Sequence, residues 1–232
     1  MRILAIETSA KAASVALLEG ERLVAQNFQH AGLTHSRTLL AMVHGLLTGL
    51  GLTLAEVDKI AVACGPGSFT GIRIGVATAK GLALGADKPL AGVSSLAAMA
   101  HQAKHLGKGT ICAAMDARRG QVYNALFRAE GETLHRLTED RAIPIQTLFE
   151  KAEMAPYLLV GDGATLCYDW LKTAGIQAKI LPEHLAQQTA WGVAMAAMEA
   201  PGESVHNINP AYIRPSQAER EREARLQNQG GK

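Results

Sequence analysis

Residues 65–75, with the sequence GPGSFTGIRIG, are the stretch that decides the fold of this 232-residue chain. They follow the short apolar run IAVAC, which is typical of a buried strand, and they lead into GVATAKGLALGA, which has the composition of a helix. Gly65 and Gly67 can adopt backbone angles that a side chain forbids, and Ser68 or Thr70 can cap the first helical turn. The stretch therefore predicts a strand, a tight turn and a helix start.

Two uses of this turn remain open. The free amides of a helix start, together with the helix dipole, suit a bound anion. The stretch lacks the lysine of a Walker phosphate loop, and its glycine spacing does not match the dinucleotide-binding fingerprint. A tight turn without a ligand and an anion-binding turn are therefore both compatible with the sequence.

The composition argues against several classes of protein. A formal net charge of +2 and 19% charged residues do not indicate a nucleic-acid or membrane-surface binder, and 4% aromatic residues argue against a base-stacking platform. The cysteines Cys64, Cys112 and Cys167 lie far apart in apolar runs, as expected for core residues in a reduced compartment. Glu7 comes too early for the apolar core of a signal peptide, and no apolar run approaches the ~20 residues of a membrane helix. We expect a cytoplasmic protein without membrane contact.

The predicted elements occur in the same order twice, as three strands followed by alternating helices and strands. In the first half we expect strands at residues 2–8, 13–18, 21–28, 60–64 and 90–93, and helices at 34–50, 69–85 and 94–105. In the second half we expect strands at 111–116, 122–127, 133–137, 157–160 and 178–181, and helices at 145–154, 166–173 and 184–198.

This repeat predicts an α/β fold of two similar lobes, each a mixed β-sheet with flanking helices. We expect the first lobe at residues 1–107 and the second at 108–215. Residues 216–232 alternate in charge and are expected to form a charged tail or a short helix.

The duplicated order is similar to that of the actin, hexokinase and heat-shock-chaperone superfamily, an actin-like ATPase or ribonuclease H-like duplication. That resemblance implies a nucleotide site between the lobes, with phosphates held by the first hairpin of each lobe. Glu7, Thr8 and Ser9 are the candidates in the first hairpin, and Asp116 is the candidate in the second.

The second hairpin departs from the superfamily pattern. Arg118 and Arg119 stand where a phosphate-binding loop would have glycines, so the cleft is predicted to be degenerate. The carboxylates have an ordinary alternative role, as strand-end groups bonded to turn amides. Asp162, between two glycines after a strand, is typical of a turn, although in a kinase-like relative such a turn would approach the adenine.

Four motifs carry a closer resemblance, and they are spread over nearly the whole chain. They are ILAIETS near the start, GPGSFTGIRIG, MDARRGQVY at the second hairpin and PAYIRP near the end. On these motifs the chain is similar to the TsaB family, also called YeaZ.

The resemblance implies a non-catalytic partner subunit of the complex that forms threonylcarbamoyladenosine in tRNA. The catalytic subunit TsaD would transfer the threonylcarbamoyl group to the adenosine beside the anticodon, and the ATPase TsaE would dock on the pair. No intrinsic cofactor is implied, but ATP or ADP would bind at the complex interface with TsaE, and tRNA would be contacted only within the complex. The alternative is an ATP-binding phosphotransferase or ATPase that works in its own cleft.

The resemblance also implies that the helices predicted at 34–50 and 69–85 bind TsaD, and that the chain forms a homodimer through the same surface. Glycine inside a helix costs about 1 kcal/mol relative to alanine, so repeated glycines suggest close approach of another backbone. Close packing of these helices on the chain's own sheet or on each other is the alternative. The predicted interface residues are Met42, Gly45, Gly49, Gly71, Arg73, Gly75, Thr78, Ala79 and Leu82, and a bulky residue at Gly75 or Ala79 is expected to block both assemblies.

A metal site is not predicted. His30 and His35 are five residues apart, whereas two ligands on one helix face would be four apart, and the chain has no HExxH motif. Near the other end, Arg214 in PAYIRP is expected either to tie the second lobe to the first, with an Asp or Glu at the cleft as its candidate partner, or to be a free surface residue.

Overall fold

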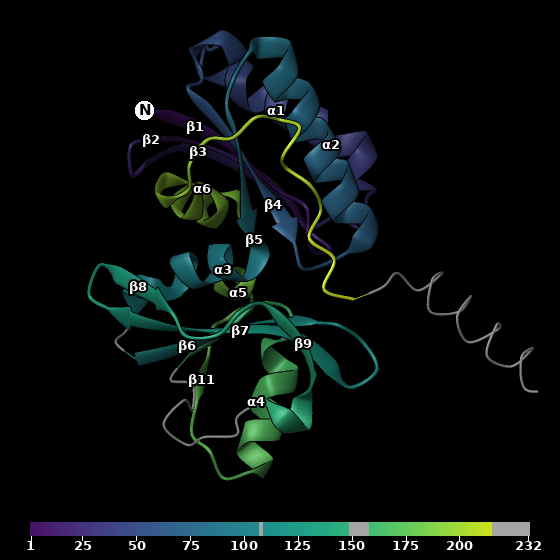
Figure 1. Cartoon of the computed structure of the whole chain (residues 1–232), viewed down its shortest axis with the longest axis vertical. Helices are drawn as coiled ribbons and strands as arrows, with labels where there is room; N and C mark the ends of the chain where they lie inside the picture. The colour runs from purple at the N-terminus through teal and green to yellow at the C-terminus, as the bar shows by residue number, and fades with distance from the viewer. Residues whose placement is uncertain (107–108, 149–157, 215–232) are drawn as a thin grey trace, which may run out of the picture.

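The computed structural model describes residues 1–106, 109–148 and 158–214. Its strands form two sheets, one in each lobe, and the two lobes lie one above the other in Figure 1. The predicted α/β fold with two mixed sheets and flanking helices is confirmed. None of the helices in these ranges is long and apolar enough to cross a membrane.

The first lobe contains a five-stranded sheet in the order β3-β2-β1-β4-β5. Its strands are β1 (Arg2–Glu7), β2 (Ala13–Glu19), β3 (Arg22–Gln29), β4 (Lys59–Gly65) and β5 (Leu90–Ser94). Its connecting helices are α1 (His35–Gly49), the 3-10 turn η1 (Leu54–Glu56) and α2 (Phe69–Ala86).

The second lobe contains a sheet in the order β11-β10-β6-β7-β8, with β9 also paired to β7. Its strands are β6 (Gly109–Asp116), β7 (Gln121–Glu130), β8 (Thr133–Arg136), β9 (Arg141–Pro144), β10 (Leu158–Val160) and β11 (Lys179–Ile180). The remaining elements are α3 (Ser95–Ala103), η2 (Lys104–Leu106), η3 (Ile145–Thr147), α4 (Ala164–Thr173), α5 (Glu183–Ala186) and α6 (Ala190–Glu199).

The two sheets share one topology. In the first, β1 pairs antiparallel with β2 and parallel with β4, and β4 pairs parallel with β5. In the second, β6 pairs antiparallel with β7 and parallel with β10, and β10 pairs parallel with β11. The repeated element order in the sequence therefore corresponds to a duplicated fold.

Alternating residues of the central strands bury against different helices, as the period of two in a strand requires. In β1, Leu4 and Ile6 pack against α1 and α2, whereas Ile3 and Ala5 pack against α6. In β6, Ile111 packs with α3, while the other side of the sheet carries α4. The layers are thus α1 with α2, the first sheet, α6 with α3, the second sheet, and α4 (Figure 1).

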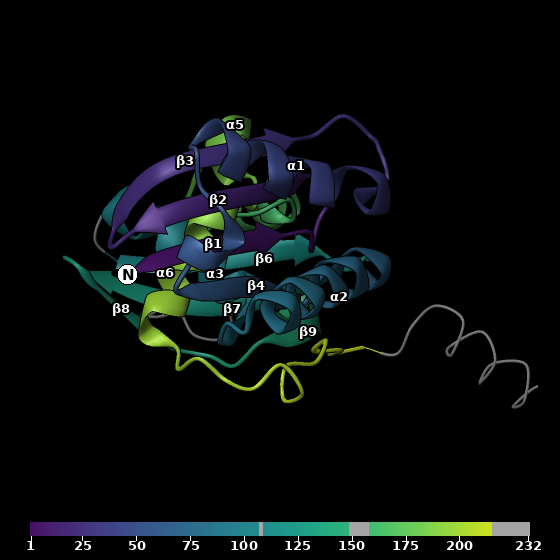
Figure 2. The same ribbon diagram turned by 90° about the horizontal axis from the view of Figure 1, so that it is seen from above.

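The helices between the sheets cross the predicted lobe boundary. The division at residues 107 and 108 separates the two sheets, since β5 ends at Ser94 and β6 begins at Gly109. However, α6 comes from the second half of the sequence and covers the first sheet, and α3 comes from the first half and packs on the second sheet. A final segment, residues 203–214, also returns along the first lobe (Figure 2), and we call it the strap.

Some predicted elements differ from those observed. The helix predicted at 145–154 is preceded by β9 and begins with η3, and its remainder lies partly outside the described residues. The helix predicted at 184–198 is two helices, because the chain is extended at Gln187. The predicted tail helix lies outside the described residues.

The inward face of α2 packs closely on the end of β1. A Cβ atom added at Gly71 would collide with the Thr8 carbonyl oxygen, and one added at Gly75 would collide with Thr8 Oγ1. The Thr8 hydroxyl donates a hydrogen bond to the Gly71 carbonyl (2.8 Å), and Ala79 is fully buried on the same side. Gly71, Gly75 and Ala79 therefore contact their own lobe, which is the alternative that the sequence left open.

The same correction applies on α1, where Met42 lies in the core of the lobe. Four of the nine residues predicted for the interface are therefore buried and do not reach the surface: Met42, Gly71, Gly75 and Ala79. A bulky residue at Gly75 or Ala79 would therefore disrupt the fold before it could block an assembly.

Two glycines of α2 should respond in opposite ways to alanine. Gly75→Ala should lower the free energy of unfolding by about 1–3 kcal/mol, because the added methyl group overpacks the contact with Thr8. Gly81→Ala should raise it by up to about 1 kcal/mol, because Gly81 is exposed with nothing within 4 Å of its Cβ position. Urea unfolding of both variants measures this, and equal effects would contradict the packing of α2 described above.

Candidate functional site

A cleft of about 950 Å³ lies between the two lobes. Its walls are the hairpin after β1, the start of α2, the β6–β7 turn, Asp162 and the end of the strap. Residues from both hairpins predicted from the sequence therefore meet at one cavity, as the superfamily resemblance implied.

The start of α2 is fixed against the first hairpin. The Ser68 amide donates to the Ser9 carbonyl (2.7 Å), and Gly67 has no space for a side chain because a Cβ there would collide with Ser9. Ser68 is the N-cap, since its hydroxyl accepts from the Gly71 amide (3.2 Å). This contact explains why the turn contains glycine and serine at these positions.

Glu7 ends β1 and is completely buried. The Ser9 amide donates to Glu7 Oε1 (2.5 Å), whereas Glu7 Oε2 has no hydrogen-bond partner among the described residues. Burial raises the pKa of Glu7 from 4.5 to about 7, although the hydrogen bond from the Ser9 amide opposes the rise. Glu7 does not line the cleft, so it is poorly placed to hold a metal ion or a phosphate there.

Asp162 lies beyond β10 and lines the cleft. Gln188 Nε2 donates to Asp162 Oδ1 (3.0 Å). Desolvation raises the pKa of Asp162, and the Gln188 hydrogen bond opposes this. The residue is nevertheless exposed to solvent. Its charge also contributes to the raised pKa of Glu7, so the two carboxyls are electrostatically linked across the lobes.

The second hairpin is not a phosphate loop. Asp116 is exposed and its Oδ1 accepts from the Arg118 amide of its own turn (2.6 Å). Arg118 and Arg119 have positive φ values of 62° and 57°, which non-glycine residues adopt only at a cost. The turn thus projects two arginines where the superfamily would offer glycine amides.

Of the four predicted cleft residues, the structure places Ser9 and Asp116 at the cleft. Thr8 is turned toward α2, and Glu7 is sealed beneath the hairpin. The Ser9 hydroxyl is buried and has no hydrogen-bond partner among the described residues. Asp116, Asp162 and Glu183 line the cavity, but Asp116 accepts the amide of its own turn and Asp162 accepts from Gln188.

The strap adds Tyr212 to the site, a residue that the sequence indicated only as part of the PAYIRP motif. Tyr212 stacks on Phe69, with 4.2 Å between ring centroids, and the Arg73 guanidinium lies 3.9 Å from the Phe69 centroid. Arg73 Nε also donates to the Tyr212 hydroxyl (2.7 Å). Arg214 donates to the Ala117 carbonyl of the β6–β7 turn (2.8 Å), so the strap is tied to the second lobe, but through a backbone carbonyl and not through the expected Asp or Glu.

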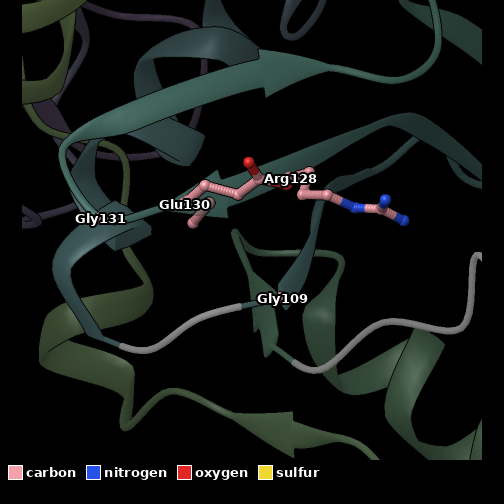
Figure 3. A pocket seen from close by; sticks show the side chains of 5 residues that line it. Gly109, Arg128, Glu130 and Gly131 are labelled. Atoms are coloured by element: carbon pink, nitrogen blue, oxygen red, sulfur yellow. The ribbon is translucent and has the colours of Figure 1, made fainter.

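Two other features, a pair of histidines and a second hollow, are weaker candidates for a functional site. His30 and His35 both line the cleft, but His35 Nε2 bonds to the Ala10 carbonyl (2.9 Å), and no group of three or more metal-ligating acidic, histidine or cysteine residues occurs within the described ranges. A second, shallower hollow lies beside β6 and β7 and is lined by Gly109, Arg128 and Glu130, with the Arg128 guanidinium pointing away from Gly131 (Figure 3).

The buried Glu7 carboxyl should make stability fall as the pH rises. Its pKa is about 7 in the folded protein and 4.5 ordinarily, so between these values the folded state binds more protons than the unfolded state. The free energy of unfolding should therefore decrease by about 3 kcal/mol from below pH 4.5 to above pH 7.

Glu7→Gln should remove this loss, because the amide can still accept from Ser9 but carries no charge. Urea unfolding of both proteins from pH 4.5 to pH 8 provides the comparison. Parallel curves for the two proteins would show that Glu7 is not a buried titrating group.

Known proteins with similar sequences and structures point to one family. Residues 29–220 match the family model described as "TsaD: tRNA N6-adenosine threonylcarbamoyltransferase". The tRNA threonylcarbamoyladenosine biosynthesis protein TsaB of Bacillus subtilis is 34% identical over 225 residues, which cover 94% of this chain and 96% of that protein. The TsaB protein of Escherichia coli is 38% identical over 180 residues, covering 76% and 78%.

A solved structure gives the same result. YeaZ from Pseudomonas aeruginosa superposes with a TM-score of 0.77 at 28% identity, over 91% of this chain and 99% of that one. The motifs, the duplicated fold and these relatives agree: the chain belongs to the TsaB (YeaZ) family.

Proposed function

We propose that this chain is a non-catalytic partner subunit in tRNA threonylcarbamoyladenosine biosynthesis, which binds and supports the catalytic subunit TsaD. The relatives at 34–38% identity carry the name of that pathway, and the matching family model is that of the transferase itself. The observation that carries the proposal is the outer face of α1 and α2.

That face carries exposed leucines, together with glycines at which an added Cβ atom would point into open space. Leu40 is 60% exposed and Leu84 is 69% exposed. Gly45 and Gly49 on α1, and Gly81 and Gly85 on α2, have no atom within 4 Å of a built Cβ. Since α1 and α2 pack side by side on one side of the sheet (Figure 1), these positions form one outward surface.

The energetics of this face favour a protein partner. Four glycines in two helices cost about 1 kcal/mol each relative to alanine, and nothing within the lobe compensates for that cost. Close approach of another pair of helices would compensate, because glycine lets backbones come near each other. We therefore move the proposed interface outward. Gly45, Gly49, Arg73, Thr78 and Leu82 remain in it, and Leu40, Ala41, Gly81, Leu84 and Gly85 are added.

The cleft supports the alternative enzyme less well. A phosphotransferase or ATPase would need ionised carboxylates and phosphate-binding amides in the cavity. Glu7 is sealed with a raised pKa, and Asp116 is bonded to the turn that projects Arg118. These features support an assembly role over chemistry in this chain's own cleft.

The remaining parts of the proposal follow from the same surface. A homodimer through α1 and α2 would compete with the TsaD complex, because both would use one face. TsaE would dock on the assembled pair, with ATP or ADP at that junction, and the complex would act in the cytoplasm. None of these steps requires a cofactor held by this chain alone.

Substitutions on the outer face should break the complex without unfolding the lobe. Gly81→Arg and Leu84→Arg should each weaken binding to purified TsaD by about tenfold or more, because a buried unpaired charge costs more than the ~1.4 kcal/mol that a tenfold change represents. Light scattering with calorimetry measures the stoichiometry and the affinity.

Leu166→Arg is the matched control, since Leu166 is an exposed leucine on α4 in the other lobe. It should bind TsaD as the unmodified chain does. Normal TsaD binding by both Gly81→Arg and Leu84→Arg would refute the proposed interface.

A further inference from the structure

The cleft mouth combines an aromatic stack with a set of cations. Phe69 and Tyr212 are stacked with an interplanar angle of 22°, and Arg73 lies over Phe69. Tyr212 remains 42% exposed. The stack therefore presents π surface and a guanidinium at an opening between the lobes, where a planar ligand could stack on it.

Five cations lie in the same cleft lining as this stack or directly beside it, and we call them the basic rim: Lys11, Arg73, Arg118, Arg119 and Arg214. Lys11, Arg118 and Arg214 line the cleft itself, and Arg119 follows in the same exposed turn. None of the five forms an ion pair with a carboxylate of the described residues, whereas Arg2, Arg22 and Arg136 elsewhere do. Their charge is therefore available to a ligand.

The carboxylates at the cleft offset this charge only in part. Asp116 already accepts the Arg118 amide. Desolvation raises the pKa of Asp162, and the buried Glu7 lies behind the hairpin with a pKa of about 7. Glu183 is the remaining carboxylate that lines the cavity. Three carboxylates therefore line the cleft beside Lys11, Arg118 and Arg214. Arg73, which contacts Phe69 and Tyr212, and Arg119, which follows Arg118, bring the cations to five, so they exceed the carboxylates by two.

We propose that the aromatic stack and the basic rim form a contact surface for the anticodon region of tRNA. Single-stranded RNA offers unpaired bases that stack on aromatic rings and a phosphate chain that binds lysine and arginine. An acidic peptide would use the cations but not the stacking face. This inference rests on the proposed function, because that function brings tRNA to the complex.

The proposed surface differs from the expectation drawn from composition. The low aromatic content argued against a stacking platform, but Phe69 and Tyr212 are two of only eight phenylalanine and tyrosine residues and they meet at one site. The low overall charge likewise conceals a local concentration of cations. Averages over the chain cannot report such clustering.

The test measures fluorescence anisotropy of a labelled anticodon stem-loop RNA, with the full chain alone and with its TsaD complex. Binding should weaken as salt rises from about 50 to about 200 mM. Arg118→Asn combined with Arg119→Asn should reduce affinity about tenfold and lower the salt slope by one to two units. Asparagine tolerates the left-handed backbone at both positions, so the turn should be retained.

Three further variants separate stacking from charge. Tyr212→Leu should reduce affinity about fivefold or more, whereas Tyr212→Phe should retain it, because phenylalanine keeps the ring and loses only the hydroxyl bonded to Arg73. Lys172→Gln is the matched charge control, since Lys172 is an exposed cation near the end of α4. It should leave affinity unchanged.

The outcomes are distinct from those of the partner test. If the Arg118/Arg119 and Tyr212→Leu variants still bind TsaD but lose RNA, the surface is an RNA contact. If they lose TsaD and RNA together, the RNA loss follows from the lost complex and the inference is overturned, whereas loss of TsaD binding by Gly81→Arg with normal RNA binding bears on the proposed function alone. Unchanged RNA binding by the double arginine variant, or no binding by either the chain or the complex, would overturn the inference. Displacement of the RNA by low concentrations of ATP would also overturn it, because the cleft would then be a nucleotide site.

Discussion

The packing of α2 against the hairpin after β1 is the contact on which the rest of the structure depends. Gly67, Gly71 and Gly75 have no side chains, and Thr8 and Ser9 occupy the space that side chains would fill. This contact sets the orientation of the helix and one wall of the cleft. It also decides which residues of α2 face outward, because a helix buried along one stripe must expose the opposite one.

The same contact also bears on whether the chain acts by assembly or by catalysis. It turns the Thr8 hydroxyl toward the helix and leaves Glu7 sealed behind Ser9, so two of the residues that a nucleotide would use are occupied by the fold itself. The outward stripe of α2 then joins that of α1 in a surface without a partner in its own lobe. The cleft keeps a cavity with Arg118 and Arg214 in its lining, which is consistent with the proposed contact with a polyanion.

The sequence predicted the strand–turn–helix unit and the repeat because these depend on local periods and on turn residues. It did not predict which glycines of α2 were buried, since Gly75 and Gly81 look alike until the position of Thr8 is known. The crossing of α6 to the first sheet was missed because an apolar helix pattern does not specify which sheet it covers. The contact of Arg73 with Tyr212 joins residues 139 positions apart, and no local pattern reports it.

Reconstitution of tRNA modification from TsaD, TsaE and the other purified enzymes of the pathway, with and without this chain, tests the central claim most directly. The account predicts that modification requires the chain, continues with Glu7→Gln combined with Asp116→Asn, and stops with Gly81→Arg. Modification that proceeds equally well without the chain would contradict the account. So would loss of modification in the carboxylate variant while its complex with TsaD still forms, because the chemistry would then lie in this chain's own cleft.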